Sequence, residues 1–154
     1  MNRDHSINFQ YGNDATSAVN TWDHWHLIPA TRPVVVQPTP VYNYVDIPGM
    51  DGSLDITDYL VGHPTYSDRQ GSFEFYVEND YGNWFDRSHE IASYLDGKRV
   101  LRMTLEDDPE HCYIGRFYFK QWAPDASHSR VTIEYRVKPY RYKPSGKDVE
   151  KDGL

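Results

Sequence analysis

Two histidines, His24 and His26, are the first residues whose types and spacing could support chemistry. On a β-strand, side chains two residues apart leave the same face, so both imidazoles would point the same way, as paired metal ligands do. A metal site would need further ligands, and neither H-E-x-x-H nor H-x-x-E-H spacing occurs. The alternative is that this Trp-Asp-His-Trp-His run is an aromatic packing strip at a sheet edge or subunit contact. We expect the packing strip, and no metal or other cofactor.

A second group of candidate residues is acidic. Glu106, Asp107, Asp108 and Glu110 place four carboxylates within five positions. They could form a calcium clamp, but the interleaved glycine and loop length of a calcium loop are missing. They could also form a charged projection that binds a partner. Paired acids for glycoside hydrolysis are a further alternative, although nothing in the sequence fixes the separation between carboxylates that hydrolysis requires. We expect a solvated hairpin tip.

Nucleophilic and nucleotide chemistry have little support. Cys112 is the only cysteine, which excludes an intrachain disulfide and any multi-cysteine metal cluster. It lies within an expected strand, where a cysteine is usually a small buried hydrophobe. The chain contains no G-x-S-x-G, no G-x-G-x-x-G and no Walker loop. The sequence therefore predicts a protein that is not an enzyme.

Composition narrows the class of protein further. A chain of 154 residues fits one domain, and its 13 Tyr and 4 Trp favour sheets and contact surfaces. The net charge of −7 argues against stable nucleic-acid binding, because phosphate contacts need basic surfaces. No run of 18 apolar residues occurs, and the first residues are polar, so we expect a soluble protein without a membrane contact or a secretion signal.

The elements that must position these residues are mainly strands. Alternation of apolar and polar residues indicates a half-buried strand, and Phe73, Phe75 and Val77 alternate in this way with Glu74, Tyr76 and Glu78. Prolines bracket a β-branched run at 34–37 and suggest an edge strand. Further strands are expected at 41–47, 101–105, 112–119 and 131–137.

One helix is expected, over residues 86–95. Asp86 is suited to cap its first turn, and Ile91 and Leu95 share a face. Gly97 is expected to end the helix, because glycine readily adopts the left-handed conformation found after the last turn of many helices. A helix this short needs tertiary packing, so Ile91 and Leu95 should lie on the sheet. The predicted fold is mainly β, a β-sandwich or split-barrel-like arrangement of antiparallel sheets with one short α-helix packed on the sheet.

A compound turn follows the strand at 41–47. Pro48 fixes φ at the first corner, Asp51 is a typical turn residue, and Gly49 and Gly52 permit the positive φ of tight turns. Residues 45–57, V-D-I-P-G-M-D-G-S-L-D-I-T, resemble the V-P-G-x-D-G turn in the N-terminal domain of distal tail (Dit-like) proteins of long-tailed phages. The strand and K-P-Y segment at 131–142 resemble the closing strand of that family.

The resemblance implies a structural virion protein at the phage tail tip, assembled in the host cytoplasm. It implies a homohexameric ring that joins the tail tube protein to the tail-tip or baseplate hub protein. We expect the fold-defining turn to be formed by Pro48, Gly49, Asp51 and Gly52. For the ring interface we expect Trp22, Trp25, Val34, Val36, Leu101, Met103, Tyr113 and Phe117.

The expected organisation has a flexible N-terminal arm at 1–20, a Dit-like β domain at 21–143 and a disordered tail at 144–154. Many Dit-like proteins carry a C-terminal carbohydrate-binding module after the closing strand. The chain stops where such a module would begin, so we do not expect direct sugar binding. The alternatives are a small β-sandwich carbohydrate-binding module that uses exposed Trp and Tyr, another tail protein such as a tail tube or tail-completion protein, and a metalloenzyme at His24 and His26.

Overall fold

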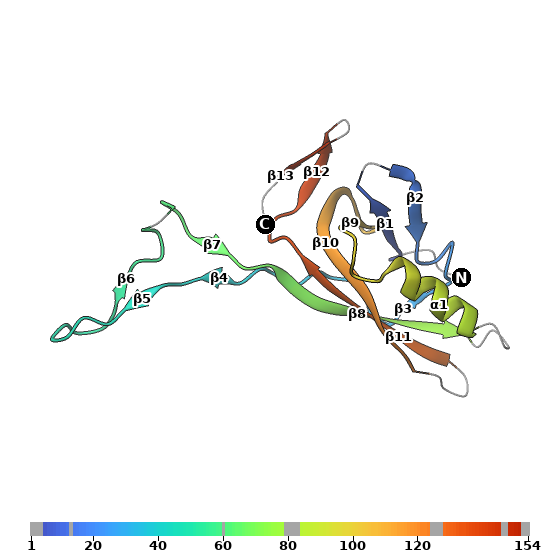
Figure 1. The fold of residues 1–154 in the computed structure, drawn as a ribbon, viewed down its shortest axis with the longest axis horizontal. Helices are drawn as coiled ribbons and strands as arrows, with labels where there is room; N and C mark the ends of the chain where they lie inside the picture. The colour runs from blue at the N-terminus through green and yellow to red at the C-terminus, as the bar shows by residue number, and fades with distance from the viewer. Residues whose placement is uncertain are drawn as a thin grey trace.

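One antiparallel sheet forms the body of the molecule (Figure 1). The computed structural model describes residues 5–12, 14–59, 61–78, 84–123, 128–145 and 148–151. The strands of the sheet lie in the order β2-β1-β9-β10-β11-β8-β3, and β12 and β13 are attached through β10. Their bounds are β1 Ile7–Tyr11, β2 Asp14–Asn20, β3 Ile28–Pro29, β8 Arg69–Glu78, β9 Leu101–Leu105, β10 Asp108–Ala123, β11 His128–Val137, β12 Tyr142–Ser145 and β13 Asp148–Lys151.

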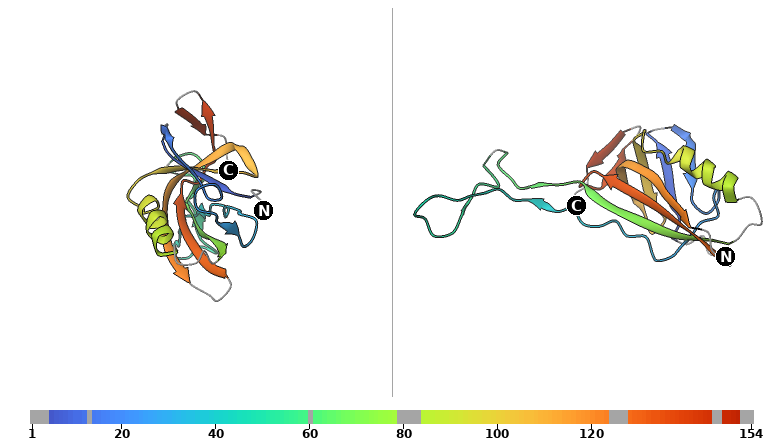
Figure 2. Two further views of the ribbon diagram at one scale, coloured as in Figure 1. Left: turned by 90° about the vertical axis from the view of Figure 1, so that its right-hand side faces the viewer. Right: turned by 60° about the horizontal axis from the view of Figure 1, so that its bottom comes forward.

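The sheet is strongly curved, and β10 spans most of the curve (Figure 2). The first part of β10 pairs with β9 and the second part with β11, with a register shift between Phe119 and Gln121. Such irregularities bend a strand and increase its twist. The sheet thus curves around its own apolar face. All of its strand pairs are antiparallel, which confirms the prediction of antiparallel β structure with one short helix.

Alternation of side chains builds the core as the sequence predicts. Phe73, Phe75 and Val77 of β8 are buried, and so are the corresponding residues of β9 and β11. Phe9, Trp25 and Phe117 add aromatic contacts, with the Phe9 and Phe117 rings edge to face at 5.1 Å. The buried cluster also includes Leu101, Met103, Leu105, Val131, Ile133, Tyr135 and Val137.

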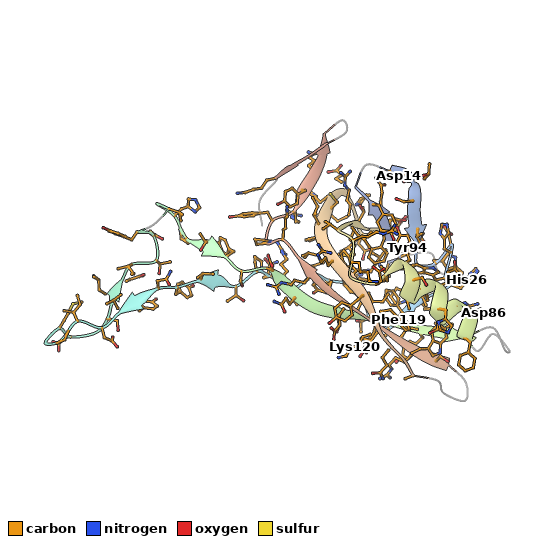
Figure 3. The ribbon with its side chains drawn as sticks, viewed as in Figure 1. Asp14, His26, Asp86, Tyr94, Phe119 and Lys120 are labelled. Carbon is orange, nitrogen blue, oxygen red and sulfur yellow. The ribbon has the colours of Figure 1, made fainter. Side chains whose placement is uncertain are left out.

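Helix α1, Trp84–Tyr94, lies against the body of the molecule and ends beside β10. Ile91 and Leu95 are fully buried, as predicted. Gly97 has the expected positive φ, +74°, but the helix ends at Tyr94, three residues before it. The prediction that Asp86 caps the helix is wrong, because the helix begins two residues earlier and Asp86 lies in its first turn (Figure 3). A carboxylate in that turn still favours the helix through its dipole.

Both predicted flexible ends are corrected by the structure. Ile7–Tyr11 and Asp14–Asn20 form β1 and β2 in the main sheet, where Ile7 and Phe9 are fully buried, so the expected arm at 1–20 is wrong over those two ranges. Residues 1–4 lie outside the described residues. Instead of a disordered tail, β12 and β13 form a hairpin over the described parts of 142–151.

The expected strand at 34–37 is also absent, since residues 31–39 have no regular secondary structure. The backbone of Val36 is bound by side chains rather than by a neighbouring strand. Within the described ranges, α1 is too short and too polar to be a membrane-spanning helix.

Candidate assembly interface

A long arm projects from the body, and we define it as residues 39–67 (Figures 1 and 2). It contains β4 (Pro40–Val41), β5 (Tyr44–Val45), β6 (Leu54–Asp55) and β7 (Thr65–Tyr66). β4 pairs with β7 and β5 with β6, so the outgoing and returning legs form a narrow ribbon. These strands contact each other in pairs and make no contact with any other described strand or helix. The arm therefore has no support from the core.

Hydrogen bonds between the two legs give the arm its shape. The amide of Ser67 donates to the Thr39 carbonyl at 2.9 Å, and that of Ile56 donates to the Asn43 carbonyl at 2.9 Å. The amide of Asn43 donates in turn to the Thr57 hydroxyl at 3.0 Å. An isolated two-stranded ribbon is only marginally stable in water, so this element gains from a partner.

The compound turn predicted from the sequence forms the tip of the arm. Gly49 has φ +83° and Gly52 has φ +73°, which confirms the positive φ expected there. The amide of Met50 donates to the Ile47 carbonyl at 3.1 Å and closes the first bend. The turn shapes the arm rather than the core, because every residue from 41 to 55 is exposed.

The surface of the arm is apolar and acidic. Its 29 residues hold nine of the fourteen large hydrophobic side chains that are exposed in the described structure: Val41, Tyr42, Tyr44, Val45, Ile47, Met50, Leu54, Tyr59 and Val61. Tyr59 is 83% exposed. The arm also carries four aspartates and no Lys or Arg. Contiguous apolar exposure of this kind is typical of a contact surface.

The root of the arm is fixed to the body through Val36. Its N–H donates to the Tyr135 hydroxyl at 3.1 Å, and its carbonyl accepts from Arg69 Nη1 at 3.2 Å. Arg69 Nε also donates to the Pro139 carbonyl at 2.9 Å, and neighbouring Val35 is buried. Arg69 begins β8, so one side chain ties the returning leg to the outgoing leg.

Arg69 is a charged group inside the protein, with only 2% of its surface exposed. Burial lowers the pKa of its guanidinium, although Arg remains charged in proteins. Its charge lies over the ring of Tyr113, 5.3 Å from the centroid. A buried cation held by two carbonyls and a ring is costly to displace, which makes the root rigid.

The residues expected at a ring interface divide into two groups. Trp25, Leu101, Met103, Tyr113 and Phe117 are buried in the chain's own core and are not available to a partner, so that part of the prediction is wrong. The apolar alternation that pointed to a contact surface serves the internal core instead.

The remaining predicted contacts stay accessible. Val34 is 69% and Val36 45% exposed beside the root of the arm, and Trp22 is half-buried. The excess of aromatic residues indicated a contact surface, and Tyr42, Tyr44 and Tyr59 of the arm are indeed exposed, whereas the exposure of Met50 was not predicted. The apolar residues at 41–47, which lie between two prolines and have no basic residue near them, could have indicated an exposed contact segment.

The two histidines lie in a turn, so the strand geometry assumed for them is wrong. His24 Nδ1 accepts from the amide of Asn20 at 3.0 Å. His26 has φ +54°, and its ring meets Trp22 edge to face with centroids 5.4 Å apart. No group of three metal-ligating side chains occurs among the described residues.

The acidic cluster is engaged with groups of the chain itself. Asp107 contacts His5 Nδ1 at 2.7 Å, and Asp108 contacts His111 and Arg141 at 3.0 and 3.3 Å. Only Glu106 and Asp107 separate β9 from β10, so the hairpin tip is shorter than predicted. These carboxylates fix the N-terminal and C-terminal segments to the hairpin.

Cys112 is fully buried in β10, as predicted for a strand cysteine. Burial raises the pKa of its thiol, which disfavours the reactive thiolate.

Comparison with solved structures adds to this geometry. The chain superimposes on the Dit protein of phage SPP1, described as a paradigm of the hub adsorption apparatus in phages that infect Gram-positive bacteria, with a TM-score of 0.62 at 19% identity. The fold is Dit-like. The match covers 90% of this chain and 52% of the SPP1 protein, so the chain spans about half the length of that Dit protein.

A weaker likeness is to a chain in the baseplate of the anti-feeding prophage, with a TM-score of 0.41 at 12% identity, covering 99% of this chain and 95% of that one. A likeness at this level adds nothing to the assignment of the Dit-like fold. No protein-family model and no curated protein matches the sequence.

Proposed function

We propose that this chain is a structural subunit of a phage tail, a distal tail protein that forms a ring between the tail tube and the tail-tip or baseplate hub protein. The observation that carries the proposal is the exposed apolar arm on a Dit-like fold. A ribbon without core contacts is stabilised when its surface is buried against another molecule. A role in assembly explains why such a surface is kept.

A ring requires an asymmetric contact. We propose that the arm of each copy contacts a different part of the next copy, so that the copies associate head to tail. Such a heterologous contact closes into a ring when the rotation between copies divides a full turn. We propose six copies, as the family resemblance implies, with a non-enzymatic role in the virion. The rigid root at Val36 holds the angle on which closure depends.

The test compares the chain with a variant that lacks the arm. Because the Ser67 amide and the Thr39 carbonyl are 2.9 Å apart, residues 40–66 are replaceable by an Asn-Gly turn. Sedimentation equilibrium at micromolar concentration should give a ring for the full chain and a folded monomer for the variant. A full chain that stays monomeric, or a variant that assembles equally well, contradicts the proposal.

A further inference from the structure

The four residues between β11 and β12 lie beside the root of the arm, and we call residues 138–141 the latch (Figure 1). The carbonyl of Pro139 accepts a hydrogen bond of 2.9 Å from Arg69 Nε. The same guanidinium donates from Nη1 to the Val36 carbonyl at 3.2 Å. One buried side chain therefore joins the latch to the root of the outgoing leg.

The latch also meets the returning leg. The ring of Tyr140 lies edge to face with that of Tyr66 in β7, with centroids 6.2 Å apart. The ammonium group of Lys151 in β13 lies 3.7 Å from the centroid of the Tyr140 ring. Tyr140 thus contacts the arm and the C-terminal hairpin, β12 with β13, at the same time.

The latch and the hairpin are held on the body by few contacts. The amide of Lys138 donates to the Ile114 carbonyl at 2.9 Å, and Arg141 pairs with Asp108 at 3.3 Å through side chains that are 32% and 35% exposed. Strand β12 meets β10 at one register position and otherwise pairs with β13. A two-stranded hairpin and a partly exposed ion pair each contribute little stability. The latch can therefore leave the body while the main sheet stays intact.

Burial of Arg69 links the position of the latch to that of the arm. Arg69 is 2% exposed, so its N–H groups need protein partners. Without the Pro139 carbonyl, a donor of a buried cation lacks its acceptor, and the guanidinium gains by turning toward water. That movement also breaks its hydrogen bond to Val36, and the contact between Tyr140 and the arm is lost with the latch. The two contacts are thus kept or lost together.

We propose that the latch controls the arm. While the latch lies on the body, Arg69 and Tyr140 hold both legs. When the C-terminal hairpin is displaced, both contacts are lost and the arm turns at its root. A partner bound to the hairpin thereby frees the arm, and because such coupling is reciprocal, a partner that fixes the arm stabilises the hairpin. The latch acts within one copy, so this inference goes beyond the proposed ring and does not depend on it.

Substitutions that do not touch the arm test the coupling. Arg141→Gln removes the ion pair with Asp108, and Lys151→Gln removes the cation over Tyr140. Lys143→Gln is the matched control, because it removes the same charge at an exposed position of β12. Arg141→Lys keeps the charge and should behave as the unchanged chain.

The direct electrostatic effect of Arg141→Gln has the opposite sign. Burial, with a smaller contribution from the charge of Arg141, lowers the pKa of Arg69. Loss of the Arg141 charge alone therefore favours the charged form of Arg69. Loosening of the arm in this variant must act through the latch.

Hydrogen exchange measured by mass spectrometry reports on the root of the arm. The amide of Val36 is bonded to the Tyr135 hydroxyl and that of Ser67 to the Thr39 carbonyl, and a peptide of β11 is the internal reference. Single copies are used, as checked by sedimentation and obtained by dilution or with Ile47→Ser and Met50→Ser at the tip of the arm.

We expect Arg141→Gln and Lys151→Gln each to speed exchange in the peptides that contain Val36 and Ser67 by at least about threefold, with β11 unchanged. Both should also speed exchange in the latch. Lys143→Gln should have neither effect. A third variant combines Tyr140→Ala with Arg141→Gln and Lys151→Gln, and it should give the largest change at both places.

Two results overturn the inference. In one, the latch exchanges faster and the root of the arm does not, which means that the two are not coupled. In the other, the latch stays protected even in the combined variant, which means that it does not separate from the body. Neither result bears on the ring, whose test is the sedimentation of the full chain, so the proposed function and this inference can fail separately.

Discussion

The hydroxyl of Tyr135 accepts a hydrogen bond of 3.1 Å from the backbone N–H of Val36. A core side chain thus fixes the backbone at the root of the arm, three residues before the arm begins. Tyr135 is itself fixed, because it is 3% exposed and its ring stacks on Phe73 at 4.8 Å. The direction of the arm is therefore set by the position of a core side chain.

Removal of that hydroxyl should loosen the arm without disturbing the core. Tyr135→Phe keeps the ring and its stack on Phe73 but leaves the Val36 amide without its acceptor. We expect a loss of about 1 kcal/mol in the free energy of unfolding, measured by denaturant titration. The same variant should form rings less well. Tyr44→Phe in the exposed arm is the matched control and should leave the stability of the body unchanged.

Gly115 should tolerate no side chain. A Cβ there would lie 2.2 Å from the Arg136 carbonyl oxygen, a backbone atom of the paired strand that cannot move independently. We expect Gly115→Ala to cost about 3 kcal/mol or more, seen as a lower thermal midpoint. Gly49→Ala is the comparison, because nothing lies within 4 Å of its Cβ and only the positive φ is strained. That strain, about 1–2 kcal/mol, is confined to the tip of the arm. Equal losses for the two variants would contradict this account.

Tyr94 should make the protein sensitive to alkali. Burial, with a smaller contribution from Tyr11 nearby, raises its pKa to about 12, and its hydroxyl donates to the Ser17 carbonyl at 2.7 Å. The folded state keeps the proton to a higher pH than the unfolded state, whose tyrosine has an ordinary pKa near 10. Stability is thus fully present below about pH 10 and falls as the pH rises from 10 to 12.

The alkaline effect is measured by urea titration across that pH range. Tyr94→Phe should flatten the fall, at a cost of about 1 kcal/mol at neutral pH from the lost hydrogen bond. Tyr59→Phe, in a position 83% exposed, should leave the slope unchanged. An unaltered slope in the Tyr94 variant would show that its hydroxyl is not the group that titrates.

The Cys112 thiol should be protected in the native state. It is fully buried, and burial raises its pKa, so little thiolate forms at pH 8. We expect labelling with a disulfide reagent to be at least about a thousandfold slower than in denaturant, because reaction requires the protein to open. Rapid labelling of the native chain would mean that β10 opens locally.

Local patterns in the sequence predicted the centre of the fold and the tip of the arm. The alternation of Phe73, Phe75 and Val77 and the glycine at 97 depend on near neighbours, and the structure confirms them. The N-terminal strands were missed because their pairing is not local. Phe9 lies opposite Met103, and two buried anchors in a polar segment carry little signal without that partner.

The candidate interface was harder to predict for a related reason. The alternation of apolar and polar residues at 41–47 predicts a strand with one apolar face, but it does not indicate whether that face packs on the chain's own core or on another molecule. The structure shows Val41, Val45 and Ile47 exposed, whereas Trp25 and Phe117 face inward. The joint among Val36, Tyr135 and Arg69 links three segments far apart in the sequence, and no pattern in any one of them indicates it.

Negative-stain imaging of the purified chain tests the central claim, that the arm is completed by another copy, most directly. At micromolar concentration the account predicts closed rings of uniform diameter with a central opening. A field of separate single molecules at that concentration, with no closed assemblies, would contradict it.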